Sequence, residues 1–195
     1  MMKRYSIPIL ALLLTGSFSL KAQSSKSADG LYLKPEDFKN QDVKERLAPG
    51  DRLQINSFFG GSDIKLVRKG QNTTFAKSDL FGYRFKGKDY RFFKDGEYEI
   101  ADTVGFYLYK RKELTAGRKG QVPQTVYYFS KSAESELVRL TIGNLNKAYQ
   151  EQDKFRYALM DFFKTDAQLT SYDPQLKMYQ LKYIYSQHAK SMLSK

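Results

Sequence analysis

Turn signals recur every eight or nine residues between residues 60 and 96, and no other feature limits the possible folds of this chain more. They are Gly60-Gly61, Gly70, Ser78-Asp79, Gly87 and Asp95-Gly96. Segments of about five residues between such turns are typical of a meander of antiparallel strands. Asp95-Gly96 is the strongest hairpin signal, because a type I′ turn needs positive φ at both central positions.

Two further strands are expected at residues 104–111 and 125–129, with a glycine-containing loop at residues 114–123 between them. In the first of these, Phe106 and Leu108 alternate with Tyr107 and Tyr109, so the two sets point to opposite faces of the strand. Both sets are at least partly apolar. We therefore expect that other parts of the chain cover both faces there.

The hydrophobic period changes after residue 132. Apolar residues now recur mostly at the three- and four-residue spacing of helices, namely Leu137, Leu140, Leu145, Ala148, Phe155, Ala158, Leu159, Phe162 and Phe163. Thr141 or Ser132 would cap the first helix, and Asp153 would cap a second that runs to about residue 164. Asp173 and Pro174 predict a third helix from residue 174 to about residue 188, since aspartate suits the cap and proline the first helical position.

Strands followed by helices predict an α+β fold. We expect an N-terminal antiparallel β meander, either a sheet or a partly closed barrel, followed by about three C-terminal helices. The expected divisions are a signal peptide at residues 1–22, a flexible leader at 23–29, an antiparallel β region at 30–131 and a helical region packed on it at 132–195.

The first 22 residues have the three-part layout of a signal peptide. Lys3 and Arg4 precede an apolar run at residues 7–14, and small and polar residues follow up to Ala22. The run is too short to cross a hydrocarbon layer of about 30 Å as a helix of about 20 residues, which argues against the alternative of a membrane anchor. We expect cleavage after Ala22, a periplasmic or secreted location, and no membrane span after cleavage.

Four short motifs resemble those of a group of bacterial proteins. They are Gly30-Leu-Tyr-Leu-x-x-Glu-Asp-Phe38, Leu80-Phe-Gly-Tyr-Arg-x-x-Gly-Lys-Asp-Tyr90, Leu140-Thr-x-x-Asn-Leu145 and Asp153-Lys-Phe155. The pattern is similar to that of uncharacterised exported proteins of Bacteroidota-type bacteria and spans most of residues 30–186. The resemblance implies export and supports the expected fold, but it supplies no catalytic residues.

The chain contains no cysteine and a single histidine, His188. The missing thiols exclude disulfides, iron–sulfur clusters and cysteine nucleophiles, and a single imidazole excludes a metal site built from several histidines. The sequence has no Gly-x-Ser-x-Gly elbow and no phosphate-binding glycine motif. We expect no catalytic residue, no cofactor and no metal site. His188 is interpreted as a surface residue near the end of the last helix, where a positive charge suits the helix dipole.

Asp95, Glu97 and Glu99 alternate along one expected strand, so their carboxylates share a face. Such a row is usually a solvated surface, but it leaves open a hydrolase that works with carboxylates alone, as glycosidases do. The triplet at residues 102–104 resembles a short acceptor pattern for periplasmic O-glycosylation, which makes Thr103 a weak glycosylation candidate.

Positive charge dominates the strand half of the chain. The whole chain has 33 basic and 21 acidic residues, a net charge of +12. Residues 23–133 hold 21 basic and 14 acidic residues, a net of +7, while residues 134–195 hold 9 and 7, a net of +2. The densest group lies around the expected loop: Lys110, Arg111, Lys112, Arg118 and Lys119.

This charge predicts an anionic partner. Nucleic acid is a poor match for an exported protein, so we expect an acidic protein or an anionic envelope polymer that contacts the five basic residues. The leading interpretation is an exported, soluble, non-enzymatic binding or assembly module with a basic surface. The alternative is the carboxylate-based, glycosidase-like hydrolase.

Overall fold

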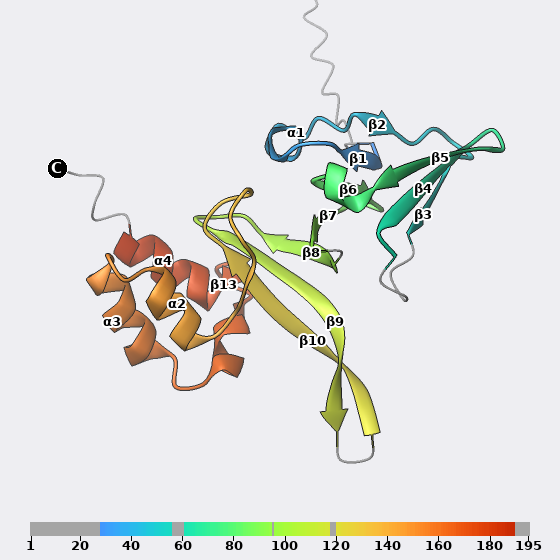
Figure 1. The fold of residues 1–195 in the computed structure, drawn as a ribbon. Coiled ribbons are helices and arrows are strands. Elements are labelled where there is room, and N and C mark those ends of the chain that lie inside the picture. Colours follow the sequence, from blue (N-terminus) through green and yellow to red (C-terminus); the bar gives the residue numbers. More distant parts are fainter. Residues whose placement is uncertain (1–27, 56–60, 95, 118–119, 190–195) are drawn as a thin grey trace, which may run out of the picture.

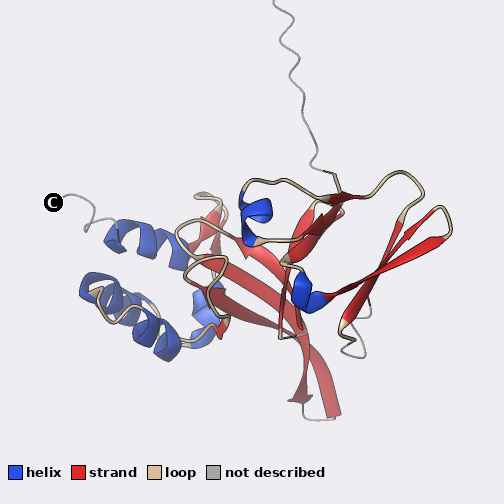
Figure 2. Ribbon diagram, turned by 45° about the horizontal axis from the view of Figure 1, so that its top comes forward, coloured by secondary structure: helices blue, strands red, loops and turns tan. Residues whose placement is uncertain are grey.

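Eight antiparallel strands form one sheet that runs through the middle of the molecule (Figures 1 and 2). The structure is a computed structural model and describes residues 28–55, 61–94, 96–117 and 120–189. Across the sheet the order is β11 (Val138–Arg139), β10 (Gly120–Ser130), β9 (Tyr107–Gly117), β8 (Gly96–Asp102), β7 (Lys88–Phe93), β6 (Gly82–Phe85), β1 (Gly30–Tyr32) and β2 (Glu45–Arg46). The sheet is open, with β11 and β2 as its edges, and the predicted α+β class is confirmed.

Smaller elements surround this sheet. A three-stranded sheet contains β3 (Arg52–Ile55), β4 (Asp63–Arg68) and β5 (Gln71–Ala76), and a two-stranded one contains β12 (Tyr172–Asp173) and β13 (Met178–Tyr179). The α-helices are α1 (Pro35–Lys39), α2 (Ile142–Ala148), α3 (Asp153–Phe162) and α4 (Gln180–Ala189), and the 3-10 helices are η1 (Lys77–Asp79) and η2 (Asp166–Thr170). Figure 1 shows α2, α3 and α4 together at one end and β3–β5 at the other.

The meander is confirmed from β6 to β11, since each of these strands pairs with the next along the chain. The N-terminal strands differ from this pattern. β1 lies between β6 and β2, with Leu31 opposite both Tyr83 and Glu45, and β3–β5 form a meander of their own. The chain therefore leaves the large sheet after β2 and returns to it at β6.

One face of the large sheet, which we call the helix-side face, carries a cross-strand row of Tyr83, Tyr90, Glu99, Lys110 and Tyr127. At the Tyr83 end of this row, the side chains of the three-stranded sheet form an apolar cluster with β1, β6 and β7. Beyond its other end, helices α2–α4 pack on β9 and β10 in the largest cluster. Glu99 and Lys110 thus lie between two covering layers.

The opposite face, which we call the loop-side face, has a core of its own. Tyr32 and Phe81 pack there against Phe38 of α1 and against Ala133. Nearby, Tyr109 packs in a cluster with Leu137, from the segment between β10 and β11. Both faces of β9 are therefore covered where the alternation of its apolar residues predicts it.

Hairpin turns explain the regular spacing of the meander. At Lys69-Gly70 and at Lys86-Gly87 both residues have positive φ, as the type I′ turn requires. The expectation that Asp95-Gly96 forms the next turn is wrong by one residue, because Gly96 already pairs with Phe93 as the first residue of β8. Packing explains why residue 96 is a glycine, since a Cβ at this position would lie 2.7 Å from the Arg111 guanidinium.

The first two C-terminal helices are confirmed with shorter bounds. Thr141 caps α2, and its hydroxyl accepts a hydrogen bond from the backbone N–H of Asn144 at 3.0 Å. Leu137 and Leu140 are not helical as expected; the N–H of Leu140 instead donates to the carbonyl of Tyr127 beside β11. Asp153 is the first residue of α3 rather than its cap.

The third helix begins six residues later than predicted, at Gln180. The Asp173 carboxylate accepts hydrogen bonds from the N–H groups of Gln175 and Leu176, at 2.8 and 3.0 Å, but these close a turn between β12 and β13. An aspartate followed by proline suits a turn as well as a helix start, and here the pairing of the two short strands decides between them.

The predicted signal peptide and most of the predicted leader lie outside the described residues. In the part of the chain that the structure describes, no helix has both the length and the apolar character that a membrane crossing needs.

Candidate functional site: a projecting β-hairpin arm

The outer halves of β9 and β10 extend away from the rest of the molecule (Figure 1). β8 pairs with β9 only as far as Lys110, and β11 pairs with β10 at Tyr128 and Phe129. Beyond these points the two strands pair, among the described strands, only with each other. We call residues 111–117 and 120–126 the arm.

The arm corrects the expected loop at residues 114–123. Its register is continuous from Arg111 opposite Val126 to Gly117 opposite Gly120. The Thr115 hydroxyl adds a hydrogen bond of 3.3 Å to the carbonyl of Val122 on the other strand. Cross-strand backbone pairing forms this hairpin although neither strand alternates clearly between apolar and polar residues.

The basic residues predicted to bind an anionic partner do not form one cluster among the described residues. The Lys110 ammonium lies 3.2 Å from Glu99, and the Arg111 guanidinium lies 2.8 Å from Glu113 and stacks on Tyr98. Lys112 is exposed and makes no ion pair with a described residue. Arg118 and Lys119 lie outside the described residues.

The three described basic residues of this group lie in β9, near the base of the arm. Lys110, Arg111 and Lys112 lie within β9, so Lys110 is separated from Gly117 by seven steps of extended chain. At about 3.4 Å per residue this is about 24 Å. Their role in binding stays a prediction.

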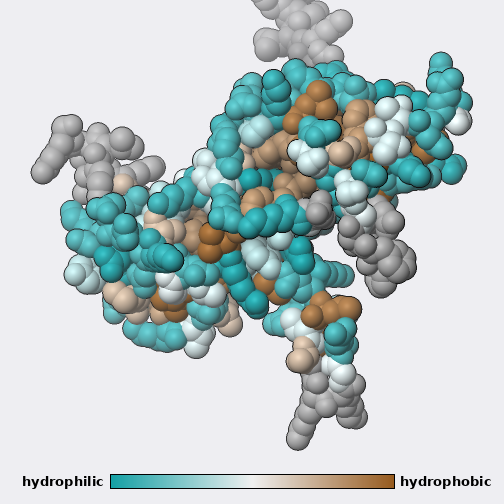
Figure 3. Space-filling model, in the orientation of Figure 1, coloured by the Kyte–Doolittle hydropathy of each residue, from teal (hydrophilic) through white to brown (hydrophobic). Residues whose placement is uncertain are grey.

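The surface of the arm is unusual for strands. Leu114 is 62% exposed and Val122 is 48% exposed, and the register places them on opposite faces. Figure 3 shows apolar surface on the arm just before its grey tip. The arm segment at residues 111–126 contains four basic residues and one acidic residue, a net of +3.

A tyrosine–carboxylate contact anchors the base of the arm. The Tyr128 hydroxyl donates a hydrogen bond to Glu113, and burial together with this carboxylate raises the pKa of Tyr128 to about 12. Glu113 also holds Arg111. The only carboxylate of the arm is therefore paired at its base, and the described residues further out, 114–117 and 120–126, carry no charge.

The carboxylate row proposed for hydrolysis has partners within the sheet. Glu97 accepts a hydrogen bond from Tyr83, and Glu99 lies 3.2 Å from both Lys88 and Lys110. Asp95 lies outside the described residues. The hydrolase alternative stays a prediction.

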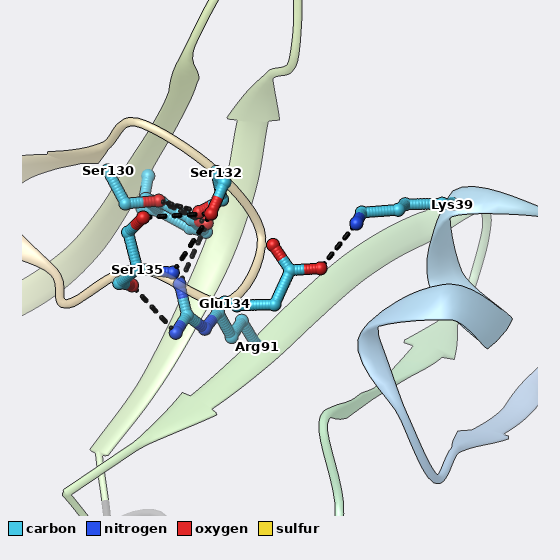
Figure 4. Close-up of polar contacts among 7 residues, drawn as sticks. Lys39, Arg91, Ser130, Ser132, Glu134 and Ser135 are labelled. Carbon is cyan, nitrogen blue, oxygen red and sulfur yellow. Dashed lines mark hydrogen bonds and ion pairs between the residues drawn. The ribbon is translucent and has the colours of Figure 1, made fainter.

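A second polar cluster, missed from the sequence, surrounds buried Arg91 on the loop-side face (Figure 4). Its guanidinium donates to the Tyr109 hydroxyl at 3.1 Å and to the carbonyl of Ser135 at 2.9 Å. It also lies 5.5 to 5.7 Å from the ring centres of Phe81, Phe93 and Tyr109. Arg91 thus joins the sheet to residues 130–136, which we call the serine loop.

Two more cations hold the serine loop. Lys39 of α1 bonds to Glu134, which lowers the pKa of this carboxyl to about 2, and Lys94 lies 2.6 Å from Glu136. The sequence Ser-Ala-Glu-Ser-Glu at residues 132–136 is the one sequence signal for this arrangement. All three cations come from the N-terminal half of the chain. Their contacts with the serine loop therefore join the N-terminal half to the C-terminal half.

Lys182 of α4 is a buried lysine that the sequence analysis also missed. Its ammonium bonds to the carbonyl oxygens of Val104 and Phe106 and lies 3.4 Å from Asp102. Burial lowers the pKa of Lys182 to about 8, an effect that Asp102 opposes. No part of its side chain is exposed, so its role is to tie α4 to the beginning of β9.

The remaining predicted residues lie apart from the arm. His188 is in the last turn of α4, where the sequence places it, and it borders a hollow together with Tyr157 and Phe162. Thr103 is exposed in the connection between β8 and β9. Among the described residues no group of three metal-ligating side chains is close enough to hold a metal ion.

Comparison of the chain with models of known protein families, with curated proteins and with solved structures finds no match.

Proposed function

We propose that this chain is an exported, non-enzymatic binding or assembly module of the bacterial envelope, and that its arm binds an acidic partner protein by strand addition. Export rests on the signal-peptide layout of residues 1–22 and on the resemblance to exported Bacteroidota-type proteins. Binding rests on the arm. The observation that carries the proposal is that both outer edges of the arm lack a neighbouring strand among those described.

An unpaired strand edge presents backbone N–H and C=O groups that another polypeptide can satisfy. The two edges of the arm differ in this respect. β10 contains Pro123, which has no N–H, and proline within sheets is confined to positions where no neighbour needs that donor. From residue 111 to residue 117, β9 contains no proline, so each backbone N–H that points away from β10 is available to a partner. The partner strand therefore adds along β9.

The charge of the arm selects among possible occupants. A second copy of this chain would bring another segment 111–126 of net +3 against the first, and like charges repel. A polysaccharide or a lipid surface carries negative charge but offers no strand backbone for the edge of β9. An extended segment of an acidic protein satisfies both the charge and the backbone.

The test uses a defined probe, a ten-residue peptide in which glutamate alternates with valine and threonine. Titration of the isotope-labelled protein, followed by amide NMR shifts and hydrogen exchange, should show binding that protects every second amide of residues 111–117, those that point away from β10. The matched peptide with lysine in place of glutamate should bind at least tenfold more weakly. Dextran sulfate, a polyanion without a peptide backbone, should shift side-chain signals without protecting these amides.

A shortened arm provides the control. Replacing residues 114–123 with Asn-Gly keeps Glu113 opposite Gln124 and gives the hairpin a favourable two-residue turn. This variant should melt as the parent does but lose the peptide. Equal peptide binding by both proteins, or equal protection by dextran sulfate, would contradict strand addition at the arm.

Export has an independent test. The intact mass of the protein purified from its native host should correspond to a chain that begins at Gln23. A chain that retains residues 1–22 in the membrane fraction would contradict the proposed location and leave strand addition to be judged on the peptide alone.

A further inference from the structure

A hollow of about 560 Å³ lies in the helical layer, far along the sheet from the three-stranded sheet. Lys131 of the serine loop, Lys147 of α2, Gln152 from the link between α2 and α3, and Tyr185 of α4 are among the residues that line it. Its volume falls within the range of small-molecule sites, which are usually concave and carry a few convergent polar groups. None of the roles described above uses this hollow.

Two cations and one carboxylate, that of Glu151, border the hollow, so its lining carries a net charge of +1. Lys131 and Lys147 are both exposed, and neither makes an ion pair with a described residue. The Lys131 ammonium lies 5.3 Å from the ring centre of Tyr149, so one of the two is already positioned over an aromatic ring. Two ammonium groups at one concave site favour a ligand with negative charge.

One residue of the lining, Gln152, has a buried acceptor without a donor in the described part of the chain. The side-chain oxygen of Gln152 is shielded from water and has no hydrogen-bond partner among the described residues. An unsatisfied buried acceptor is unfavourable, and the terminal torsion of glutamine is soft, so a small rotation can bring this oxygen to a ligand donor. A fully deprotonated anion such as sulfate has no donor for this oxygen, whereas a ligand with hydroxyl groups has one.

The floor of the hollow is aromatic. Tyr149 and Tyr185 contact each other with ring centres 5.3 Å apart, and both belong to or pack against the largest apolar cluster. Aromatic surface beside amides and cations suits the apolar face of a sugar ring whose hydroxyls and carboxylate point to the polar walls.

We propose that this hollow binds an acidic sugar, a uronic acid of roughly one or two rings. Lys131 and Lys147 pair with the carboxylate, the Gln152 oxygen accepts from a hydroxyl, and Tyr185 contacts the ring. This site is separate from the arm, so it gives the chain a glycan contact in addition to its protein partner.

The test is a titration of the full chain with digalacturonate, followed by amide NMR shifts. Saturable shifts are expected at residues 147–152, and galactose, which lacks the carboxylate, should bind at least tenfold more weakly. The double variant Lys131→Gln with Lys147→Gln should lose at least tenfold in affinity. The double variant Lys65→Gln with Lys69→Gln removes the same charge from the three-stranded sheet and should bind as the parent does.

Further comparisons decide the ligand class and the site. Gln152→Leu should weaken digalacturonate but leave sulfate unchanged, and the arm-shortened protein should retain full digalacturonate binding. Sulfate that binds as tightly as digalacturonate at the same residues would overturn the sugar assignment. Absence of saturable shifts in a folded protein, or an equal loss in both double variants, would overturn the site itself.

Discussion

The inner and outer halves of the β9–β10 hairpin share one continuous register but have different surroundings. In the inner half, Leu108 and Phe129 lie under the helical layer, and Tyr109 lies under the serine loop. In the outer half, Leu114 and Val122 face away from any other element, on opposite faces of the arm. Backbone pairing is the same in both halves, and only the side-chain environment changes.

This difference in burial indicates that the two halves of the hairpin have different roles. Burial of apolar side chains is the main source of folding free energy, so the inner half stabilises the molecule. The outer half contributes little burial and keeps its edges and apolar side chains exposed, which in most monomeric proteins is a liability. Retaining such a segment is reasonable when another molecule covers it.

The largest expected difference in the free energy of unfolding is between alanine variants of two leucines in β9. Leu108 is fully buried, and Leu108→Ala should lower the free energy of unfolding by about 2–5 kcal/mol, since it leaves a cavity in the core. Leu114→Ala should change it by less than about 0.5 kcal/mol, because the side chain is already exposed. Urea unfolding of both variants measures the contrast, and equal losses would show that the arm folds back against the body in solution.

Arg91→Leu tests how firmly the serine loop is held to the inner half of the hairpin. The change removes the hydrogen bonds to Tyr109 and Ser135, and we expect a loss of about 1–3 kcal/mol. Hydrogen exchange should accelerate in the serine loop while the arm amides remain as in the parent. Unchanged protection of the serine loop would mean that Lys39 and Lys94 hold it without Arg91.

The pH dependence of the free energy of unfolding tests the burial of Lys182, which holds α4 to the beginning of β9. Its pKa is about 8 in the folded protein and about 10.4 in an unfolded chain, so between these values the unfolded state binds more protons. The free energy of unfolding should therefore rise with pH, by about 1–2 kcal/mol between pH 8 and pH 9.5. Urea unfolding at several pH values measures this rise.

The variant Lys182→Met and two buried tyrosines show over which pH range Lys182 affects stability. Lys182→Met should remove the rise between pH 8 and pH 9.5. Above about pH 10 the sign reverses, because buried Tyr109 and Tyr149 have raised pKa values and ionise more readily once unfolded. A stability that is flat or falling from pH 8 to pH 9.5 in the parent would contradict the burial of an ionisable Lys182.

The smallest expected effect comes from Lys112→Glu in the arm. Lys112 is exposed and has no ion pair among the described residues, so stability should change by no more than about 0.5 kcal/mol. Binding of the acidic peptide should nevertheless weaken, and the difference from the parent should shrink at high salt because exposed charges are screened. A loss that persists in high salt would point to backbone distortion instead of charge.

The inner half of the hairpin is predictable from the sequence because its side chains are buried on both faces and alternate accordingly. The arm is not predictable in the same way. Gly117 and Pro123 indicate a loop when each strand is considered alone, whereas the pairing between Leu114 and Pro123 depends on the opposite strand. Hairpin length is a cross-strand property that single-strand patterns do not contain.

Dependence on distant partners also explains the other features that the sequence analysis predicted wrongly or missed. Asp173 caps a turn because β12 and β13 pair, which the Asp-Pro signal does not show. Arg91 precedes Phe92 and Phe93 and looks like an ordinary basic residue of a strand, since its partners lie more than fifteen residues away in the chain. Local signals such as the Thr141 cap and the Lys69-Gly70 turn are found correctly because they need no distant partner.

The position of β1 in the large sheet has a consequence for the order in which the chain folds. Leu31 pairs with Tyr83, whereas Phe85 pairs with Lys88 across the next hairpin. Closing the longer loop costs roughly 2–3 kcal/mol more in chain entropy, so the hairpins from β6 to β11 form first and β1 joins them late. In a chain that leaves its ribosome or crosses a membrane from the N-terminus, the first strand to emerge is among the last to be built in. The large sheet thus cannot be completed until more than 80 residues have left the ribosome.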